Sequence, residues 1–323
     1  MESLSQKLEA LKKEIGKTII GQEETVSQLL IAFLAGGHAL LEGVPGLAKT
    51  LMIRSLANAI DLTFKRIQFT PDLMPSDIIG TEILEEDHGT GKKFFKFNKG
   101  PIFSNIILAD EINRTPPKTQ AALLEAMQEF EVTYGGRTYV LERPFFILAT
   151  QNPIEQSGTF VLPEAQQDRF LLYIKIGYPD AREEEEILRA TTGTHRPKPE
   201  KAISGEEILR LQQLVREVSI SDALVAHVGD LVRSTRPGTT ALDYVREWVE
   251  WGGGPRAGQA LILTAKARAL MEGRLAVSLE DIRKMAPAVL RHRVLVNFRA
   301  EAEGIDSDAV IQQLLKTVQL REK

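Results

Sequence analysis

Residues 43–50 read Gly43-Val44-Pro45-Gly46-Leu47-Ala48-Lys49-Thr50, and this glycine-bearing turn is the most informative local pattern in the chain. An apolar segment at 38–42, typical of a short buried strand, precedes it, and a helical pattern from about 50 to 60 follows it. A tight loop between a strand and a helix directs backbone N–H groups and the positive helix end toward one point, which favours phosphate binding. The Lys49 ammonium would reach the β- and γ-phosphates of a nucleotide, and the Thr50 hydroxyl would ligate Mg²⁺.

The loop departs from the general phosphate-binding consensus at Ala48, where that consensus has glycine. Alanine is the smallest substitute for glycine and a good helix former, so we expect the turn to survive if Ala48 has a negative φ. A glycine turn followed by a chance Lys-Thr pair would explain the same residues without a ligand. The flanking strand and helix favour the phosphate-binding interpretation.

Two carboxylates follow a second apolar strand, in the sequence Ile106-Ile107-Leu108-Ala109-Asp110-Glu111. A buried strand delivers them to the carboxyl edge of a sheet, where α/β proteins place their sites. Asp110 would position Mg²⁺ and its waters, and Glu111 would orient and polarise an attacking water. Carboxylates at strand ends are common, so the pattern gains its meaning from the phosphate-binding loop earlier in the chain.

A third apolar strand, residues 145–150, ends at Gln151-Asn152. An amide side chain at that edge can hydrogen-bond the γ-phosphate or the attacking water. An Asn-Pro pair also forms turns, so Asn152 alone leaves both interpretations open.

The first half of the chain alternates helical patterns with apolar strands, which predicts a parallel sheet covered by helices on both faces. We expect strands at 38–42, 64–69, 102–109, 145–150 and 170–176, and helices at 23–35, 50–60 and 116–130. Two insertions interrupt the alternation. The first, at about 78–99, has a turn at 87–91, and the second, at about 131–141, contains the hairpin signal Tyr134-Gly135-Gly136-Arg137.

After residue 180 only helical patterns remain, so we expect an α/β domain over 1–179 and an all-helical domain over 180–323. A chain of 323 residues agrees with two domains, since a domain has roughly 100–200 residues. The expected helices span 181–191, 205–218, 222–234, 256–272, 279–290 and 306–319.

The composition excludes several classes of protein. There are 40 basic and 44 acidic residues, so a formal charge of −4 gives no general affinity for nucleic acid or an anionic membrane. The sequence has no cysteine, which removes disulfides and thiolate metal sites and suits a reducing compartment. The most apolar stretch, residues 29–35, is too short to cross a bilayer, and the first residues lack a signal-peptide pattern. We therefore expect a cytoplasmic protein without membrane insertion.

Taken together, these motifs resemble the AAA+ ATPases and, within that class, the MoxR family, whose usual loop also has alanine where Ala48 stands. The resemblance covers nearly the whole chain. Beyond the loop, it rests on Ala109-Asp110-Glu111-Ile112-Asn113-Arg114, Pro117-Lys118-Thr119-Gln120, Leu123-Leu124-Glu125-Ala126-Met127, Ala149-Thr150-Gln151-Asn152-Pro153, Leu162-Pro163-Glu164-Ala165-Gln166, Asp168-Arg169-Phe170 and Gly254-Pro255-Arg256-Ala257. It implies a three-layer AAA+ P-loop core with a parallel sheet, followed by an all-helical lid domain, and an ATPase that uses ATP and Mg²⁺.

The resemblance also implies residue roles. Lys49 and Thr50 match the Walker A motif, Asp110 and Glu111 match Walker B, and Asn152 matches sensor 1. Thr50 and Asp110 would hold the metal, and Glu111 and Asn152 would be catalytic. The implied nucleotide-binding residues are Gly21, Gln22, Gly43, Val44, Pro45, Gly46, Leu47, Ala48, Lys49, Thr50, Leu51 and Asp110.

Two further catalytic roles rest on the resemblance alone. Arg169 matches the arginine finger that completes a neighbouring subunit's site, and Arg256 matches sensor 2. The family often has Ala-Ser between glycine and the proline before sensor 2, whereas this chain has Gly252-Gly253-Gly254 before Pro255. The insertions correspond to the family's helix-2 insert and to the hairpin before sensor 1.

For function, the resemblance implies a ring, expected to be hexameric, that remodels, assembles or loads metal or cofactor into a protein client with a von Willebrand factor A domain partner. A chelatase-like motor subunit and a nucleic-acid translocating motor are the alternatives. The segment 92–99 interleaves four lysines with three phenylalanines, as a single-strand stacking surface would. It equally fits a strand with one packed face and a charged edge. We favour the latter, because the second insertion has only Arg137 against Glu131 and the chain is acidic overall. A scaffold that binds ATP without hydrolysis is disfavoured by the intact motifs.

Overall fold

The computed structural model describes residues 2–86, 89, 91–153, 159–193 and 198–320. At its centre lies a parallel sheet of five strands in the order β2-β5-β8-β1-β9. The strands are β1 (Ala39–Glu42), β2 (Phe64–Gln68), β5 (Ile106–Asp110), β8 (Phe146–Gln151) and β9 (Leu172–Lys175). Because all five run in one direction, their carboxyl ends lie along one edge of the sheet.

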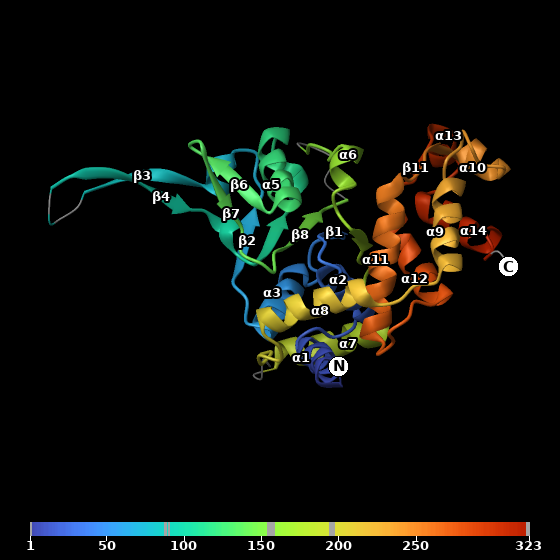
Figure 1. Cartoon of the computed structure of the whole chain (residues 1–323), viewed down its shortest axis with the longest axis horizontal. Helices are drawn as coiled ribbons and strands as arrows, with labels where there is room; N and C mark the ends of the chain where they lie inside the picture. The colour runs from blue at the N-terminus through green and yellow to red at the C-terminus, as the bar shows by residue number, and fades with distance from the viewer. Residues whose placement is uncertain (1, 87–88, 90, 154–158, 194–197, 321–323) are drawn as a thin grey trace.

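Helices cover both faces of this sheet, which makes a three-layer core (Figure 1). One face packs against α1, α2 and α3, and the other packs against α5. Successive residues of β5 divide between these two cores, with Ile106 and Leu108 in the first and Ile107 and Ala109 in the second. The helices are α1 (Glu2–Gly16), α2 (Glu23–Leu34), α3 (Lys49–Ile60) and α5 (Pro117–Glu129).

The expected strand at 102–109 is shorter than its apolar run. Residues Pro101–Phe103 form a 3₁₀ turn, η1, and the strand β5 begins only at Ile106. Pro101 starts this turn because its fixed φ suits a first helical position and its nitrogen has no hydrogen to give a sheet. The apolar character of residues 102–109 therefore does not distinguish the 3₁₀ turn η1 from the strand β5.

Both insertions form antiparallel hairpins. The strands β3 (Gly80–Glu86) and β4 (Lys93–Lys99) follow the short helix α4 (Pro75–Ile79) and project far from the core (Figure 1). Part of the expected turn at 87–91 lies outside the described residues. The strands β6 (Glu131–Tyr134) and β7 (Arg137–Val140) form the second hairpin.

An aromatic cluster joins the two hairpins. The Phe97 ring lies 4.5 Å from the Tyr139 ring and 5.1 Å from the Tyr134 ring, centroid to centroid. Phe97 therefore fixes the base of the projecting hairpin on its neighbour.

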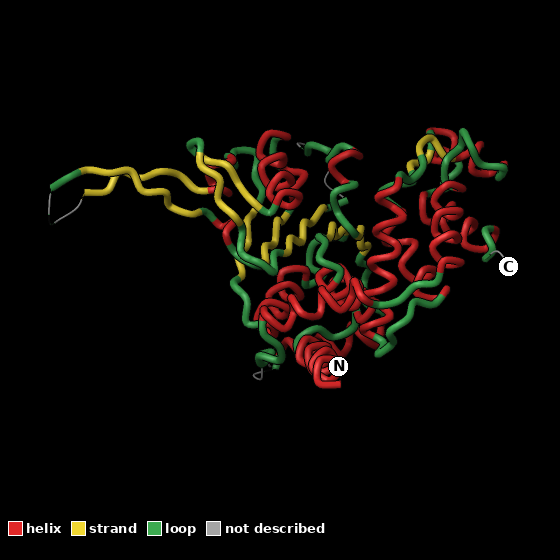
Figure 2. Tube along the Cα trace, in the orientation of Figure 1, coloured by secondary structure: helices red, strands yellow, loops and turns green. Residues whose placement is uncertain are grey.

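The part of the chain after the sheet is mainly helical, as the red segments of Figure 2 show. Our expectation of helices alone is wrong there, because β10 (Val249–Trp251) and β11 (Leu295–Val296) form a small antiparallel sheet. Strands of three and two residues are too short to display the period of two by which strands are recognised. The helices are α7 (Ala181–Thr192), α8 (Gly205–Glu217), α9 (Asp222–Ser234), α10 (Asp243–Trp248), α11 (Pro255–Met271), α12 (Leu279–Leu290), α13 (Phe298–Ala302) and α14 (Ser307–Thr317).

The helical lid packs around α11 and continues the core of the first domain. Buried side chains of α11 and α12 belong to the same apolar cluster as those of α2 and α3. Several lid helices begin at side-chain caps, for example Ser204 before α8 and Ser278 before α12. None of the described helices is both long and apolar enough to span a membrane.

Candidate nucleotide site

The 43–50 loop joins β1 to α3 and is closely packed at its start. A Cβ atom placed on Gly43 would lie 2.0 Å from Cγ2 of Ile176, so this position has no room for a side chain. Gly46 has a φ of +91°, a left-handed conformation that favours glycine. The Lys49 ammonium donates to the Gly43 carbonyl oxygen at 2.7 Å, which holds the cation against the loop.

 Ala48 has φ 55° and ψ 22°, so the loop keeps its turn although the negative φ that we set as the condition is not met. A left-handed conformation costs a residue with a Cβ roughly 1–2 kcal/mol. Ala48 is the N-cap of α3 and directly precedes Lys49, so the strained residue lies where the loop enters the helix.

The Asp110 carboxylate, at the end of β5, is buried, and both of its oxygens accept hydrogen bonds. Its Oδ1 accepts a hydrogen bond from the Thr150 hydroxyl at 2.6 Å. Its Oδ2 accepts from Nε and Nη2 of Arg66 at 3.0 and 2.6 Å. The neighbouring strands β8 and β2 therefore hold the carboxylate from both sides, as the sheet order β2-β5-β8 requires.

Glu111 follows Asp110 in a left-handed conformation with φ 59°. Its backbone N–H donates to the Thr150 hydroxyl oxygen at 2.9 Å. Its Oε2 accepts from Nε2 of Gln68 at 2.7 Å and lies 3.2 Å from Nε of Arg114. The side chain is thus held at the carboxyl edge of the sheet.

Asn152 lies at the same edge, directly after β8. The residue is buried, and β8 pairs with β5 in parallel so that Ala149 lies beside Ala109. This register brings the end of β8 next to the two carboxylates. The loop, the carboxylates and the amide thus follow three adjacent strands, β1, β8 and β5.

A cavity of about 310 Å³ lies beside the loop. Its walls come from residues 45–48, from 18–20 with Gln22, and from the first lid helix, α7. Apolar side chains dominate these walls, including Ile19, Leu51 and Leu188. An apolar cavity next to a phosphate-binding turn fits a nucleotide, with the base in the cavity and the phosphates on the loop.

Gln22 lines this cavity, whereas the preceding Gly21 lines the neighbouring cavity between α1 and α2. Both have positive φ, 67° and 56°. A Cβ on Gly21 would lie 2.6 Å from Cδ of Glu183, and Nε2 of Gln22 donates to the Gly177 carbonyl at 2.9 Å. The segment is therefore attached to the start of the lid.

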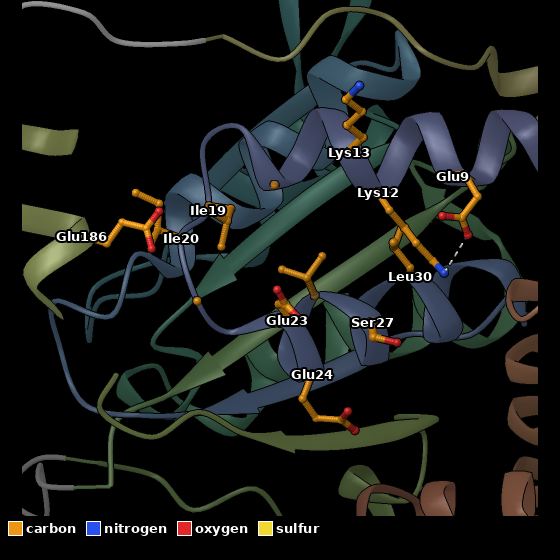
Figure 3. A pocket seen from close by; sticks show the side chains of 13 residues that line it. Glu9, Lys12, Lys13, Ile19, Ile20, Glu23, Glu24, Ser27, Leu30 and Glu186 are labelled. Atoms are coloured by element: carbon orange, nitrogen blue, oxygen red, sulfur yellow. Dashed lines mark hydrogen bonds and ion pairs between the residues drawn. The ribbon is translucent and has the colours of Figure 1, made fainter. Parts of the chain in front are cut away.

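A larger cavity of about 650 Å³ lies beside this one, between α1 and α2 (Figure 3). It shares Ile19 and Ile20 with the nucleotide cavity, but charged side chains such as Lys12 and Glu23 line much of it. Among the described residues, none of the 43–50 loop reaches this cavity. We therefore assign it no nucleotide group.

Arg169 and Arg256 lie together on a third cavity, of about 240 Å³. Nη1 of Arg169 donates to the Leu124 carbonyl at 2.9 Å, and Nη1 of Arg256 lies 3.7 Å from Oδ2 of Asp168. Over the described part of the chain, this cavity and the nucleotide cavity share no lining residue. The structure thus brings the two predicted arginines to each other, and away from the loop of their own chain.

The fold agrees with that of the proteins to which the chain is similar. Residues 38–172 match a family model described as "ATPase family associated with various cellular activities (AAA)", and residues 243–314 match one described as "AAA lid domain". Chaperone MoxR1 of Mycobacterium tuberculosis is 43% identical over 323 residues, which cover 99% of this chain and 84% of the relative. The chain belongs to the MoxR family of AAA+ ATPases.

Other relatives extend this similarity to structure. Protein MoxR of Methylorubrum extorquens is 31% identical to this MoxR-family chain, over 88% of the chain and 86% of the relative. A solved structure of a candidate ATPase from Cytophaga hutchinsonii is 43% identical and superposes with a TM-score of 0.91, covering 99% of this chain and 96% of the other.

Our sequence analysis missed several residues that contact the predicted site of this MoxR-family ATPase. Arg66 and Gln68 hold the two carboxylates, Thr150 joins them, and Arg293 binds Asp168. Alternate polar residues on β2 were a usable signal, since residues two apart on a strand face the same side. The others are positioned by strand order and by the packing of the lid.

Proposed function

We propose that the chain hydrolyses ATP in the cytoplasm at sites shared between neighbouring copies of a ring, expected to be hexameric. The observation that carries this proposal is the separation of two sets of residues. The loop and the carboxylates lie at one sheet edge, whereas Arg169 and Arg256 line a different cavity. Two arginines that lie together away from the nucleotide site of their own chain are suited to contact the γ-phosphate of ATP bound to an adjacent copy. In related NTPases an arginine supplied in trans raises the rate of hydrolysis by ~10³–10⁵.

Each group of site residues has a separate role in ATP hydrolysis. The loop N–H groups and Lys49 bind the phosphates, and Thr50 and Asp110 would hold Mg²⁺, which neutralises phosphate charge when bound. Glu111 polarises the attacking water. Because Gln68 and Arg114 engage Oε2 of Glu111, we assign Oε1 to that water. Asn152 orients the water or the γ-phosphate through its amide.

The nucleotide cavity has one wall from the core and another from α7, so binding would couple ATP to the position of the lid. We propose that this motion remodels or assembles a protein client, or loads it with metal or cofactor, together with a von Willebrand factor A domain partner. The name of the relative Chaperone MoxR1 supports the chaperone part. A chelatase-like motor subunit would use the same ATPase site to act on a different client.

Nucleic-acid translocation is a second candidate because the projecting hairpin exposes Phe94 and Phe95 beside lysines. Its partner strand weakens that candidate, since Glu85 and Glu86 lie on β3 and Nζ of Lys96 is 3.1 Å from Oε1 of Glu85. The acidic strand cancels much of the charge that a phosphate backbone would need.

The test is a trap with Glu111→Gln protein, loaded with ATP in its native extract and then purified. Loss of the water-polarising carboxylate keeps ATP bound and holds the client-bound state. Lys49→Ala protein is the matched control, because it should not retain the nucleotide. A protein partner found only with Glu111→Gln supports remodelling, and a metal-binding von Willebrand-type domain would identify the partner class. Recovery of nucleic acid instead would overturn the proposal.

A further inference from the structure

The turn between α12 and β11 contacts the segment that carries Arg169. Within this turn, the Arg293 guanidinium is nearly inaccessible, with its side chain 4% exposed. Its Nε donates to Oδ1 of Asp168 at 2.7 Å. Its Nη2 donates to the carbonyl oxygens of Phe170 at 2.7 Å and Asp168 at 3.2 Å, and its Nη1 donates to Leu171 at 3.2 Å. One planar group thus holds the residues on both sides of Arg169.

The two residues before Arg293 extend these contacts. Nε2 of His292 donates to the Phe170 carbonyl at 3.1 Å. Nη1 of Arg291 donates to the Tyr173 carbonyl at 2.8 Å. We call Arg291, His292 and Arg293 the lid clamp, because three consecutive lid residues hold the 168–173 segment of the core.

Stabilising the fold is by itself a weak explanation for burying the charged side chain of Arg293. Removing a charge from water costs several kcal/mol, and pairing often only balances that cost. Burial lowers the pKa of the Arg293 guanidinium, and the Asp168 carboxylate opposes that effect. The rigid fork of a guanidinium does, however, fix geometry in a way that an apolar side chain cannot.

The same carboxylate links the clamp to Arg256. Asp168 presents Oδ1 to Arg293, and its Oδ2 lies 3.7 Å from Nη1 of Arg256. The Arg256 side chain is 52% exposed, so its guanidinium remains accessible from outside the chain. Asp168 therefore stands between a buried arginine of the lid and an exposed one.

We infer that Arg293 is a positioning residue for Arg169 and Arg256, which it holds in one rigid unit with the lid. The inference rests on the proposed shared site. A lid that moves with the nucleotide of its own copy would carry Arg256, which lies on α11, and would act through the clamp on the core segment of Arg169, directly before β9. The state of one site would then control the arginines that reach the next.

The first experiment compares ATP turnover by the assembled full chain with Arg293→Lys, which keeps the charge and removes the fork. We expect kcat to fall about 10²-fold, because a small misplacement of a reacting group has that effect. Binding of a fluorescent ATP analogue should change less than twofold. Arg268→Lys is the matched control, since Arg268 is also a lid arginine paired with a buried carboxylate, that of Asp281, but does not contact 168–173. It should leave kcat unchanged.

Mixing distinguishes positioning from damage to the fold. Arg293→Lys subunits retain an intact loop, and Lys49→Ala subunits retain intact arginines and clamp. A mixture should turn over ATP faster than either parent, because the loop of one variant then meets the arginines of the other. If Arg293→Lys does not fold, judged by thermal unfolding, Asp168→Asn provides the same test from the exposed side of the pair.

The outcomes separate the two proposals. Turnover that survives Arg169→Ala would overturn the shared site itself. If Arg169→Ala abolishes turnover and Arg293→Lys turns over normally, the shared site stands and the clamp inference fails. Slow turnover by Arg293→Lys or Asp168→Asn without recovery in the mixture would also overturn the inference, since the defect would then lie in the variant's own nucleotide site.

Discussion

Ala48 has a left-handed backbone at the junction of the phosphate-binding loop and α3. Ala48→Gly should relieve roughly 1–2 kcal/mol of conformational strain, of which the greater freedom of unfolded glycine returns ~0.4–1 kcal/mol. We expect the free energy of unfolding to rise by about 0.5–1 kcal/mol, as measured by urea unfolding without nucleotide. Ala48→Val should lower it, because a β-branched side chain tolerates this conformation worst. A clear loss of stability in Ala48→Gly would contradict the strain.

At the same scale, what the sequence predicts depends on how far apart the interacting residues lie in the chain. The 43–50 loop is contiguous, so its turn, cation and hydroxyl could be recognised together. Arg66 and Thr150 meet at Asp110 only because β2 and β8 flank β5 in the sheet, and both residues lie far from Asp110 in the sequence. The φ of Ala48 was equally hidden, since the neighbouring loop imposes it.

At the scale of elements, His38 connects the start of β1 to α5 and β8. Nε2 of His38 donates to the Met127 carbonyl at 3.0 Å, while Nδ1 accepts from the Ile147 N–H at 3.0 Å, which requires the neutral ring. Burial lowers its pKa to about 4, and the bond to Met127 only partly opposes this.

The unfolded chain therefore binds a proton at His38 below about pH 6.5 that the folded chain does not bind until about pH 4. Stability should be fully present above pH 6.5 and fall by about 3 kcal/mol by pH 4 from this group. In His38→Gln, which keeps a hydrogen-bond donor and an acceptor, this pH-dependent contribution to the free energy of unfolding disappears. The stability difference between wild type and variant, measured by urea unfolding, should narrow as pH falls from 6.5 to 4. A constant difference would contradict the neutral buried ring.

The projecting hairpin gives a second prediction for an element. If the acidic strand β3 cancels the lysines of β4, the wild-type chain should show no salt-sensitive binding to single-stranded DNA in fluorescence anisotropy. Replacing Glu82, Glu85 and Glu86 with glutamine should create such binding, because four lysines of residues 92–99 would then lack acidic partners on β3. Binding by the wild-type chain that strengthens with ATP would revive the nucleic-acid motor.

Helices and strands could be predicted from the sequence where they are long enough to show their apolar period. The strong periods of α9 and α12 predict both helices, whereas β10 and β11 form through only two antiparallel pairs of distant residues, Val249 with Val296 and Trp251 with Leu295. The position of Arg256 was beyond prediction for the same reason, because it depends on how α11 packs against α2, α9 and α12.

At the scale of the whole molecule, the nucleotide cavity and the arginine cavity have no lining residue in common over the described chain. Under the proposed function, Arg169 and Arg256 of a second copy would therefore complete the ATP site of the first. Each contact from these arginines to the γ-phosphate would strengthen the binding of one copy to the other. We expect light scattering coupled to size exclusion to give larger particles for Glu111→Gln with ATP than without nucleotide.

Lys49→Ala should not assemble further with ATP, because it lacks the ammonium that we propose binds the phosphates. Arg169→Ala should still bind the nucleotide within its own chain, yet its assembly should respond less to ATP than that of Glu111→Gln. This difference between binding and assembly is the consequence that a self-contained site would not produce. If particle size is independent of ATP while Glu111→Gln retains it, the nucleotide does not bridge two copies, and both arginines need another role.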